Sequence, residues 1–328
     1  MSLRQEIAAR TLPCPPRKLT GSQDYSPLSW QDFFDEKQSI SINGDSFNVY
    51  TKGKTGPIYL FLHGGGYSGV TFGPLIKNMS KLIDCRIFAP DLRGHGETIC
   101  ADSNQLSRDT LVQDIANVFN SYYKAQNDVE ENPPVCVVGH SMGGAMAVRV
   151  VQSELVPNSI ALVVLDVVEG TALDALVSMN TVLNNRPEYF SSEEEAIRWC
   201  LAHSVTSNKT SARLSMPHQL KKTENNRFTW RIDLRKSEPY WREWFTGLSE
   251  AFLNNKASKL LVLAGVDRLD KTLMIGQMQG KFQTVMMPKS GHAIHEDSPF
   301  ELADALAAFS VRYRFATYHD STKTKSKA

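Results

Sequence analysis

A serine flanked by glycines directly follows a short apolar run near the middle of the chain. Residues 139–144 read Gly-His-Ser-Met-Gly-Gly, after the β-rich run Val135–Val138 and before a helix-like run at 145–150. In this GxSxG pattern the small glycines permit a strained strand-to-helix turn that exposes the serine hydroxyl. An unreactive serine in a tight turn is the alternative, and the strand–turn–helix setting argues against it. The pattern therefore predicts that Ser141 is a nucleophile.

A second glycine-rich segment, His63–Gly66, follows an earlier apolar run. It matches a loop whose backbone N–H groups hold the negative charge that develops on a carbonyl oxygen during acyl transfer. Glycine lets such donors approach a substrate without a Cβ in the way. We predict one donor at Gly65 and a second at Met142, the residue after the serine. For His63 itself we expect a structural role rather than proton transfer.

A serine nucleophile also needs a histidine base and an acid, and in this arrangement both follow the serine in the chain. His292 comes after the apolar run 285–287, late enough to return over the serine, and His295 lies three residues further on. We predict His292 as the base. Asp166 and Asp267 each follow a β-rich run. The later position is the more common one for the acid, which favours Asp267, but the residue pattern alone does not choose between them.

Short apolar runs alternate with longer helical stretches along the chain, and these elements must position the candidate residues. Near-continuous apolar strands suit a parallel sheet that helices cover on both faces, so we predict an α/β fold. A serine, a proline and a glutamate at 298, 299 and 301 predict the capped start of a surface helix. The predicted strands lie at 57–62, 86–89, 135–138, 161–165 and 260–264.

Roughly ninety residues separate the strand that ends near Asp166 from the one that starts near Leu260, whereas a simple crossover needs only about a dozen. An insert must therefore lie between them. It carries four of the five tryptophans, Trp199, Trp230, Trp241 and Trp244. Because large aromatic side chains bury much surface, we predict a packed lid at about residues 171–256 rather than a floppy loop.

Length and composition favour one α/β domain with that insertion, in a chain of 328 residues. The polar ends predict tails at residues 1–20 and 317–328 around a domain at 21–316.

With 36 basic and 35 acidic residues, nothing favours nucleic acid as a partner. The apolar runs are too short to span a membrane, and the start of the chain lacks a signal-peptide core. Five scattered cysteines fit a reducing compartment, so we expect a protein of the cytoplasm, the nucleus or both, not a secreted one.

Four stretches of the chain together resemble the protein phosphatase methylesterase family, which has the α/β-hydrolase fold. They are GHSMGGAMAV, LDVVEGTALDAL, LAGVDRLDKTLMIGQMQGKFQ and SGHAIHEDSP, and the similarity runs from about Ser26 to Phe315. The resemblance implies Ser141 as the nucleophile, Asp166 as the acid and His292 as the base. It leaves Asp267 as a neighbouring carboxylate, the second choice for the acid.

The same resemblance implies an activity, the removal of the methyl ester from the C-terminal leucine of the protein phosphatase 2A catalytic subunit. It implies no metal or organic cofactor, and we expect the lid to contact the phosphatase. One alternative is a small-molecule esterase or lipase-like hydrolase on the same scaffold. An epoxide hydrolase is disfavoured, because a serine stands where such enzymes carry an aspartate. The other alternative is a non-catalytic phosphatase-binding protein, which the intact Ser141 and His292 argue against.

Overall fold

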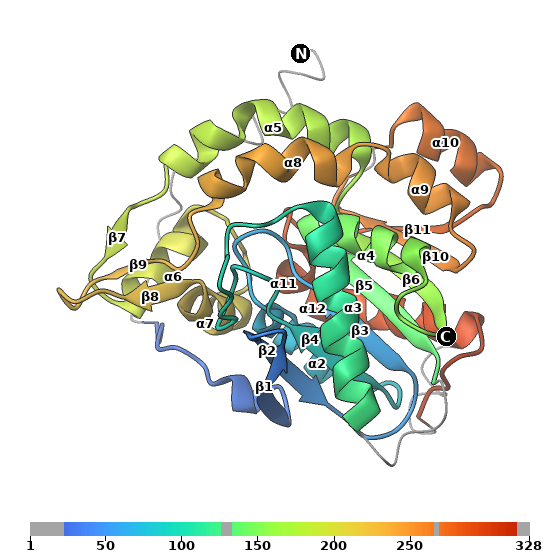
Figure 1. Ribbon diagram of the computed structural model, residues 1–328, viewed down its shortest axis with the longest axis horizontal. Coiled ribbons are helices and arrows are strands. Elements are labelled where there is room, and N and C mark those ends of the chain that lie inside the picture. Colours follow the sequence, from blue (N-terminus) through green and yellow to red (C-terminus); the bar gives the residue numbers. More distant parts are fainter. Residues whose placement is uncertain (1–22, 126–132, 266–268, 320–328) are drawn as a thin grey trace.

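An eight-stranded sheet forms the centre of the protein, a computed structural model of which describes residues 23–125, 133–265 and 269–319 (Figure 1). The strand order is β1-β2-β4-β3-β5-β6-β10-β11. The first two pairings, β1 with β2 and β2 with β4, are antiparallel, and every later neighbour is parallel. The predicted α/β architecture is confirmed. The strands are β1 Glu36–Ile42, β2 Asp45–Lys52, β3 Ile58–Leu62, β4 Arg86–Pro90, β5 Val135–His140, β6 Ser159–Leu165, β10 Ser258–Leu263 and β11 Gln283–Met286.

Helices cover both faces of the sheet, which explains why its central strands are apolar throughout. On β3, Leu60 and Leu62 belong to one core cluster, whereas Tyr59 and Phe61 belong to the other, as the two-residue period of a strand requires. Helices α3 (Arg108–Ala125) and α4 (Met142–Ser153) pack in the first cluster. The short helix η2 (Gly69–Phe72), α2 (Gly73–Met79) and α12 (Pro299–Arg312) pack in the second.

The five predicted strands all form, within about two residues of the expected bounds, as β3, β4, β5, β6 and β10. The helix predicted after Ser298 forms as α12, but the predicted cap does not. The Ser298 side chain makes no bond to the helix and pairs instead with Ser290 Oγ at 2.8 Å. A preceding turn of helix, α11 (Ile294–Asp297), brings the chain into α12 and leaves that hydroxyl facing the loop before it.

The insert, defined here as residues 169–254, runs from the end of β6 to the start of β10 (Figure 1). It has a small core of its own, in which Phe190, Ile197, Cys200 and Met216 are buried and Trp199 and Trp230 pack at the edge. Its elements are α5 Glu169–Asn184, β7 Tyr189–Phe190, α6 Glu193–Ala202, α7 Lys209–His218, β8 Leu220–Lys222, β9 Phe228–Trp230, η3 Leu234–Ser237, α8 Glu238–Phe245 and α9 Leu248–Asn254. The strands β7, β9 and β8 form a separate antiparallel sheet.

The insert is joined closely to the rest of the molecule. Trp241 and Trp244, both on α8, are buried in the main core rather than in the small one. Helix α5 packs beside α8 above the sheet (Figure 1). The predicted tryptophan-rich packing therefore serves two cores, and the insert cannot be removed without exposing the main one.

The start of the chain lies outside the described residues up to Ser22, as do the last nine positions. We expected the domain to end at 316, but Tyr318 forms a β-bridge with Ile83 and the His319 amide donates to the Leu82 carbonyl at 2.9 Å. The packed domain therefore reaches at least His319. Among the described residues no helix is both long and apolar enough to cross a membrane. The remaining short elements are η1 Trp30–Asp32 and α10 Lys271–Met278.

Candidate active site

Ser141 occupies a strained turn between β5 and α4. Its φ of 52° and ψ of −119° lie outside the regions that non-glycine residues ordinarily adopt. The turn is possible because of its glycines. A Cβ at Gly139 would overlap the Gly143 carbonyl, and a Cβ at Gly143 would overlap that of Leu62. The chain thus brings Ser141 to the carboxyl edge of the sheet, partly exposed among buried neighbours.

His292 and Asp166 meet at the same edge although 126 residues separate them. His292 lies between β11 and α11, and its Nδ1 is 2.8 Å from Asp166 Oδ2. Asp166 directly follows β6 and is buried. Its other oxygen accepts a hydrogen bond from the Ala264 amide, just after β10, at 2.9 Å. The carboxylate is therefore held on both oxygens, and it orients the imidazole so that Nε2 is left for proton transfer.

The link from the serine to the base is looser. Within the described chain, no hydrogen bond joins Ser141 Oγ to His292. The two segments nevertheless touch, because the ring of His140, which precedes the serine, lies 4.8 Å from the ring of His292 between centroids. Catalytic hydrogen bonds in unliganded enzymes are often long and tighten only around a substrate. The arrangement therefore fits a nucleophile and base that complete their contact during the reaction.

The second candidate acid, Asp267, lies outside the described residues. His295, the next histidine along the chain, is bonded to a different residue. Its Nε2 bonds Thr71 Oγ1 at 2.9 Å, and burial lowers its pKa to about 3. His63 is structural as expected, because its Nε2 accepts from the Leu92 amide at 3.0 Å and its Nδ1 donates to the Gly64 carbonyl at 2.8 Å.

The glycine loop after β3 lies against the nucleophile. A Cβ at Gly64 would lie 2.7 Å from His140 Nδ1 and 3.3 Å from Ser141 Cβ, and Gly66 has a φ of +86°. By contrast, a Cβ at Gly65 would meet only Leu234 of the insert, at 3.5 Å. The protein's own atoms therefore require glycine at 64, and the positive φ favours glycine at 66, whereas they leave room for a Cβ at 65. That a glycine at 65 lets the substrate approach the donor stays a prediction. Met142, the other predicted donor, is the first residue of α4, where backbone N–H groups have no acceptor within the helix.

This difference between neighbouring glycines gives a matched pair of variants. We expect Gly64→Ala to lower kcat for ester hydrolysis by about 10²-fold, the size of effect seen when an oxyanion donor is lost. The added Cβ must displace either His140 or the loop itself. Gly65→Ala should lower kcat far less, because the added Cβ would lie at an ordinary packing distance of 3.5 Å from Leu234. Steady-state kinetics of both variants would test this, and equal losses would refute the steric argument.

Sequence analysis missed the buried residues behind the base. His140 Nε2 donates to the His292 carbonyl oxygen at 2.9 Å and so anchors the loop that carries the base. Burial, together with His295 and His292, holds the pKa of His140 well below its usual range, so its ring is neutral at pH 7. Glu296 is also buried, which raises its pKa to about 7, and Thr71 Oγ1 donates to it. The only signal for His140 was its position inside the GxSxG pattern.

Comparisons with known proteins show the family to which the chain belongs. A model of the alpha/beta hydrolase family matches residues 59–305. A probable protein phosphatase methylesterase 1 of Caenorhabditis elegans is 49% identical over 317 residues, which span 96% of this chain and 86% of the relative. Protein phosphatase methylesterase 1 of Bos taurus is 42% identical over 340 residues, spanning 90% of this chain and 88% of the relative.

Solved structures share the fold at lower identity. An E-2-(acetamidomethylene)succinate hydrolase superposes with a TM-score of 0.68 at 20% identity, covering 84% of this chain and 98% of that one. A thioesterase domain from the curacin biosynthetic pathway superposes with a TM-score of 0.63 at 18% identity, covering 83% and 99%. At these identities the likeness concerns the fold alone.

Proposed function

Because this chain belongs to the alpha/beta hydrolase family and, within it, to the protein phosphatase methylesterases, we propose that it demethylates the protein phosphatase 2A catalytic subunit. The chain is a carboxylic ester hydrolase, and the bond to be cleaved is the methyl ester of the subunit's C-terminal leucine. The observation that carries the chemistry is the 2.8 Å contact between His292 and Asp166 beside the strained turn at Ser141. The named relatives support a phosphatase as substrate.

The proposed reaction has two halves. Ser141 Oγ attacks the ester carbonyl while His292 Nε2 takes its proton, and Asp166 stabilises the resulting imidazolium. The amides of Gly65 and Met142 hold the oxyanion, methanol leaves with the proton from His292, and an acyl-serine remains. Water then attacks this ester with His292 again as base, and the products are the free C-terminal carboxylate and the original serine.

Methanol release from the methylated catalytic subunit tests the proposal. We expect its kcat/KM to exceed that for p-nitrophenyl esters by orders of magnitude, because a specific substrate brings binding energy that small esters lack. Equal or better turnover of the small esters would make the protein a small-molecule esterase. Tight phosphatase binding without methanol release would make it a non-catalytic binding protein.

We further propose that the insert acts as a lid and docks the phosphatase together with helix α10. Val177 on α5 is 89% exposed and Met278 on α10 is 83% exposed, with Met274 and Ile275 exposed beside it. Exposed apolar side chains that gather on a surface are typical of protein-binding sites. The two helices start close together, since a Cβ at Gly170 would lie 3.4 Å from Asp270 Cβ. Both helices begin at the carboxyl edge of the sheet, where Ser141 lies.

Charge placed on this surface should separate docking from chemistry. For Val177→Asp and Met278→Asp we expect kcat/KM for the methylated phosphatase to fall about tenfold or more relative to kcat/KM for p-nitrophenyl acetate, since a buried unpaired charge at an interface is costly. Leu155→Asp is the matched control, because Leu155 is 40% exposed but lies at the opposite edge of the sheet. An unchanged ratio in both test variants would refute docking at this surface.

The proposed compartment is the cytoplasm, the nucleus or both. Four described cysteines, Cys85, Cys100, Cys136 and Cys200, are free thiols, which suits a reducing environment. Imaging of the tagged protein in cells would test this, and a signal confined to the secretory pathway would overturn it.

A further inference from the structure

Arg186 stands out among the basic residues of the insert. It follows α5, and its guanidinium lies 5.0 Å from the centroid of the Trp230 ring, a distance typical of a cation–π contact. Trp230 is fixed in turn, because its Nε1 donates to the Pro187 carbonyl at 2.7 Å and its ring packs on Trp199 and Phe190. The Trp230 ring therefore holds the guanidinium in place, while the residue remains partly exposed.

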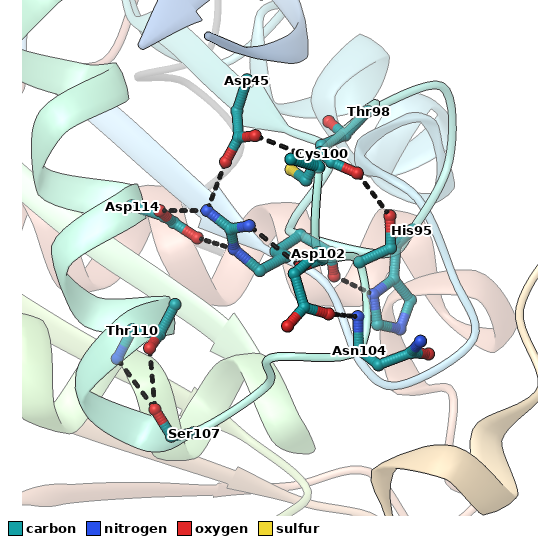
Figure 2. Close-up of polar contacts among 12 residues, drawn as sticks. Asp45, His95, Thr98, Cys100, Asp102, Asn104, Ser107, Thr110 and Asp114 are labelled. Atoms are coloured by element: carbon teal, nitrogen blue, oxygen red, sulfur yellow. Dashed lines mark hydrogen bonds and ion pairs between the residues drawn. The ribbon is translucent and has the colours of Figure 1, made fainter. Parts of the chain in front are cut away.

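This guanidinium has no anionic partner among the described residues and makes no side-chain hydrogen bond with them. Loss of hydration lowers its pKa, and the titratable groups that act on it are Tyr67 and Cys200, not a carboxylate. The buried Arg93, by contrast, has a structural role and is paired with two carboxylates. Its nitrogens lie 2.6 Å from Asp114 and 2.7 Å from Asp45, which raises its pKa. Figure 2 shows Asp45 and Asp114 converging on that site.

Arg186 also borders the catalytic machinery without belonging to it. Trp230, on whose ring it lies, ends β9, and Leu234, four residues further on, is the residue that a Cβ at Gly65 would meet at 3.5 Å. Tyr67, one of the titratable groups that act on Arg186, continues the same glycine loop, and its amide donates to the Gly64 carbonyl at 3.2 Å. The Tyr67 ring meets the ring of His140 edge-on at 5.8 Å. The described structure gives no contact of Arg186 with Ser141 or His292. Its charge therefore lies on the part of the insert that packs against the glycine loop beside the site.

We propose that Arg186 is a specificity-determining residue that binds an acidic side chain in the substrate's tail, upstream of the esterified C-terminal residue. The inference rests on the proposed function, which makes the substrate a polypeptide with a C-terminal methyl ester. The ester group itself is uncharged, so the anion has to come from another residue. A guanidinium is suited to this role, because it offers several fixed donors to a carboxylate and is more easily desolvated than an ammonium.

Peptides ending in leucine methyl ester provide the test. A single glutamate is placed in turn at each position before the ester, and every such peptide is paired with one carrying glutamine. For the wild-type enzyme we expect the glutamate peptide to be preferred about tenfold or more in kcat/KM at one position. In Arg186→Gln the ratio of kcat/KM for the glutamate peptide to that for the glutamine peptide should fall to about one. Arg186→Lys should keep part of the wild-type ratio. The ratio within one variant cancels any loss of folded enzyme.

Arg227→Gln is the matched control. Arg227 is also an arginine of the insert stacked on an aromatic ring, 4.6 Å from Tyr189, but it lies on the exposed hairpin between β8 and β9. It should retain the wild-type preference. The proposal is overturned if Arg186→Gln keeps that preference, or if wild-type enzyme that demethylates the phosphatase shows none at any position. Failure of the wild type to release methanol from methylated phosphatase would instead refute the proposed function.

Discussion

Replacement of Ser141 by alanine should lower kcat for demethylation by about 10⁶-fold, the loss measured when a triad nucleophile is removed. The reason is that no other hydroxyl is offered at the turn. Ser141 alone has the exposed position at the end of β5, with its φ of 52°. Methanol release and labelling by a fluorophosphonate probe should both disappear. Binding of the methylated phosphatase should remain, since the hydroxyl contributes little surface to a protein interface.

A serine on the same helix supplies the control for this experiment. Ser153 lies at the far end of α4 and donates to the Val150 carbonyl at 2.8 Å. Ser153→Ala should label and turn over like the wild type. Substantial methanol release by Ser141→Ala would mean that the nucleophile has been assigned wrongly.

Replacement of Asp166 by asparagine should lower kcat by about 10⁴-fold with a much smaller change in KM. The buried carboxylate holds His292 in the tautomer whose Nε2 accepts the serine proton, and it stabilises the imidazolium that follows. An asparagine has nearly the same shape but can present an N–H to the ring, which favours the wrong tautomer. Its carboxamide oxygen can still accept the Ala264 amide, so the strand ends should stay in place.

Asp267→Asn is the comparison that decides between the two candidate acids. We expect it to lower kcat far less than Asp166→Asn does. Both variants should be measured with p-nitrophenyl acetate as well as with the methylated phosphatase, because an effect confined to the phosphatase would indicate docking rather than chemistry. A larger loss in Asp267→Asn than in Asp166→Asn would show that the acid comes from the loop after β10.

The identity of the local elements could be predicted from the sequence because their signals are local. Apolar runs of strand length predicted the five central strands, which all form. The GxSxG pattern likewise describes a turn of five consecutive residues, in which Gly139 is required by the nearby Gly143 carbonyl. Gly143 is required in addition by Leu62 on the adjacent strand.

The acid could not be chosen in this way, because the choice depends on distance across the sheet. Asp166 and Asp267 both follow β-rich runs, and only the parallel pairing of β6 with β10 and of β10 with β11 brings Asp166 to His292. The expected cap at Ser298 failed for a related reason. A hydroxyl bonds to whatever the fold brings near, and here that is Ser290.

The sequence by itself therefore determined the α/β order of elements, the strained turn at Ser141 and the presence of a large packed insert. Hydrophobic periodicity acts over a few residues and the GxSxG pattern spans five, so both can be read directly from the chain. Only the tertiary structure brought Asp166 to His292, placed neutral His140 behind the base and left Arg186 without a carboxylate partner in the part of the chain that the structure describes. Hydrogen bonds and charges act between atoms a few ångströms apart, and no spacing along the chain specifies that proximity until the sheet and the insert have packed.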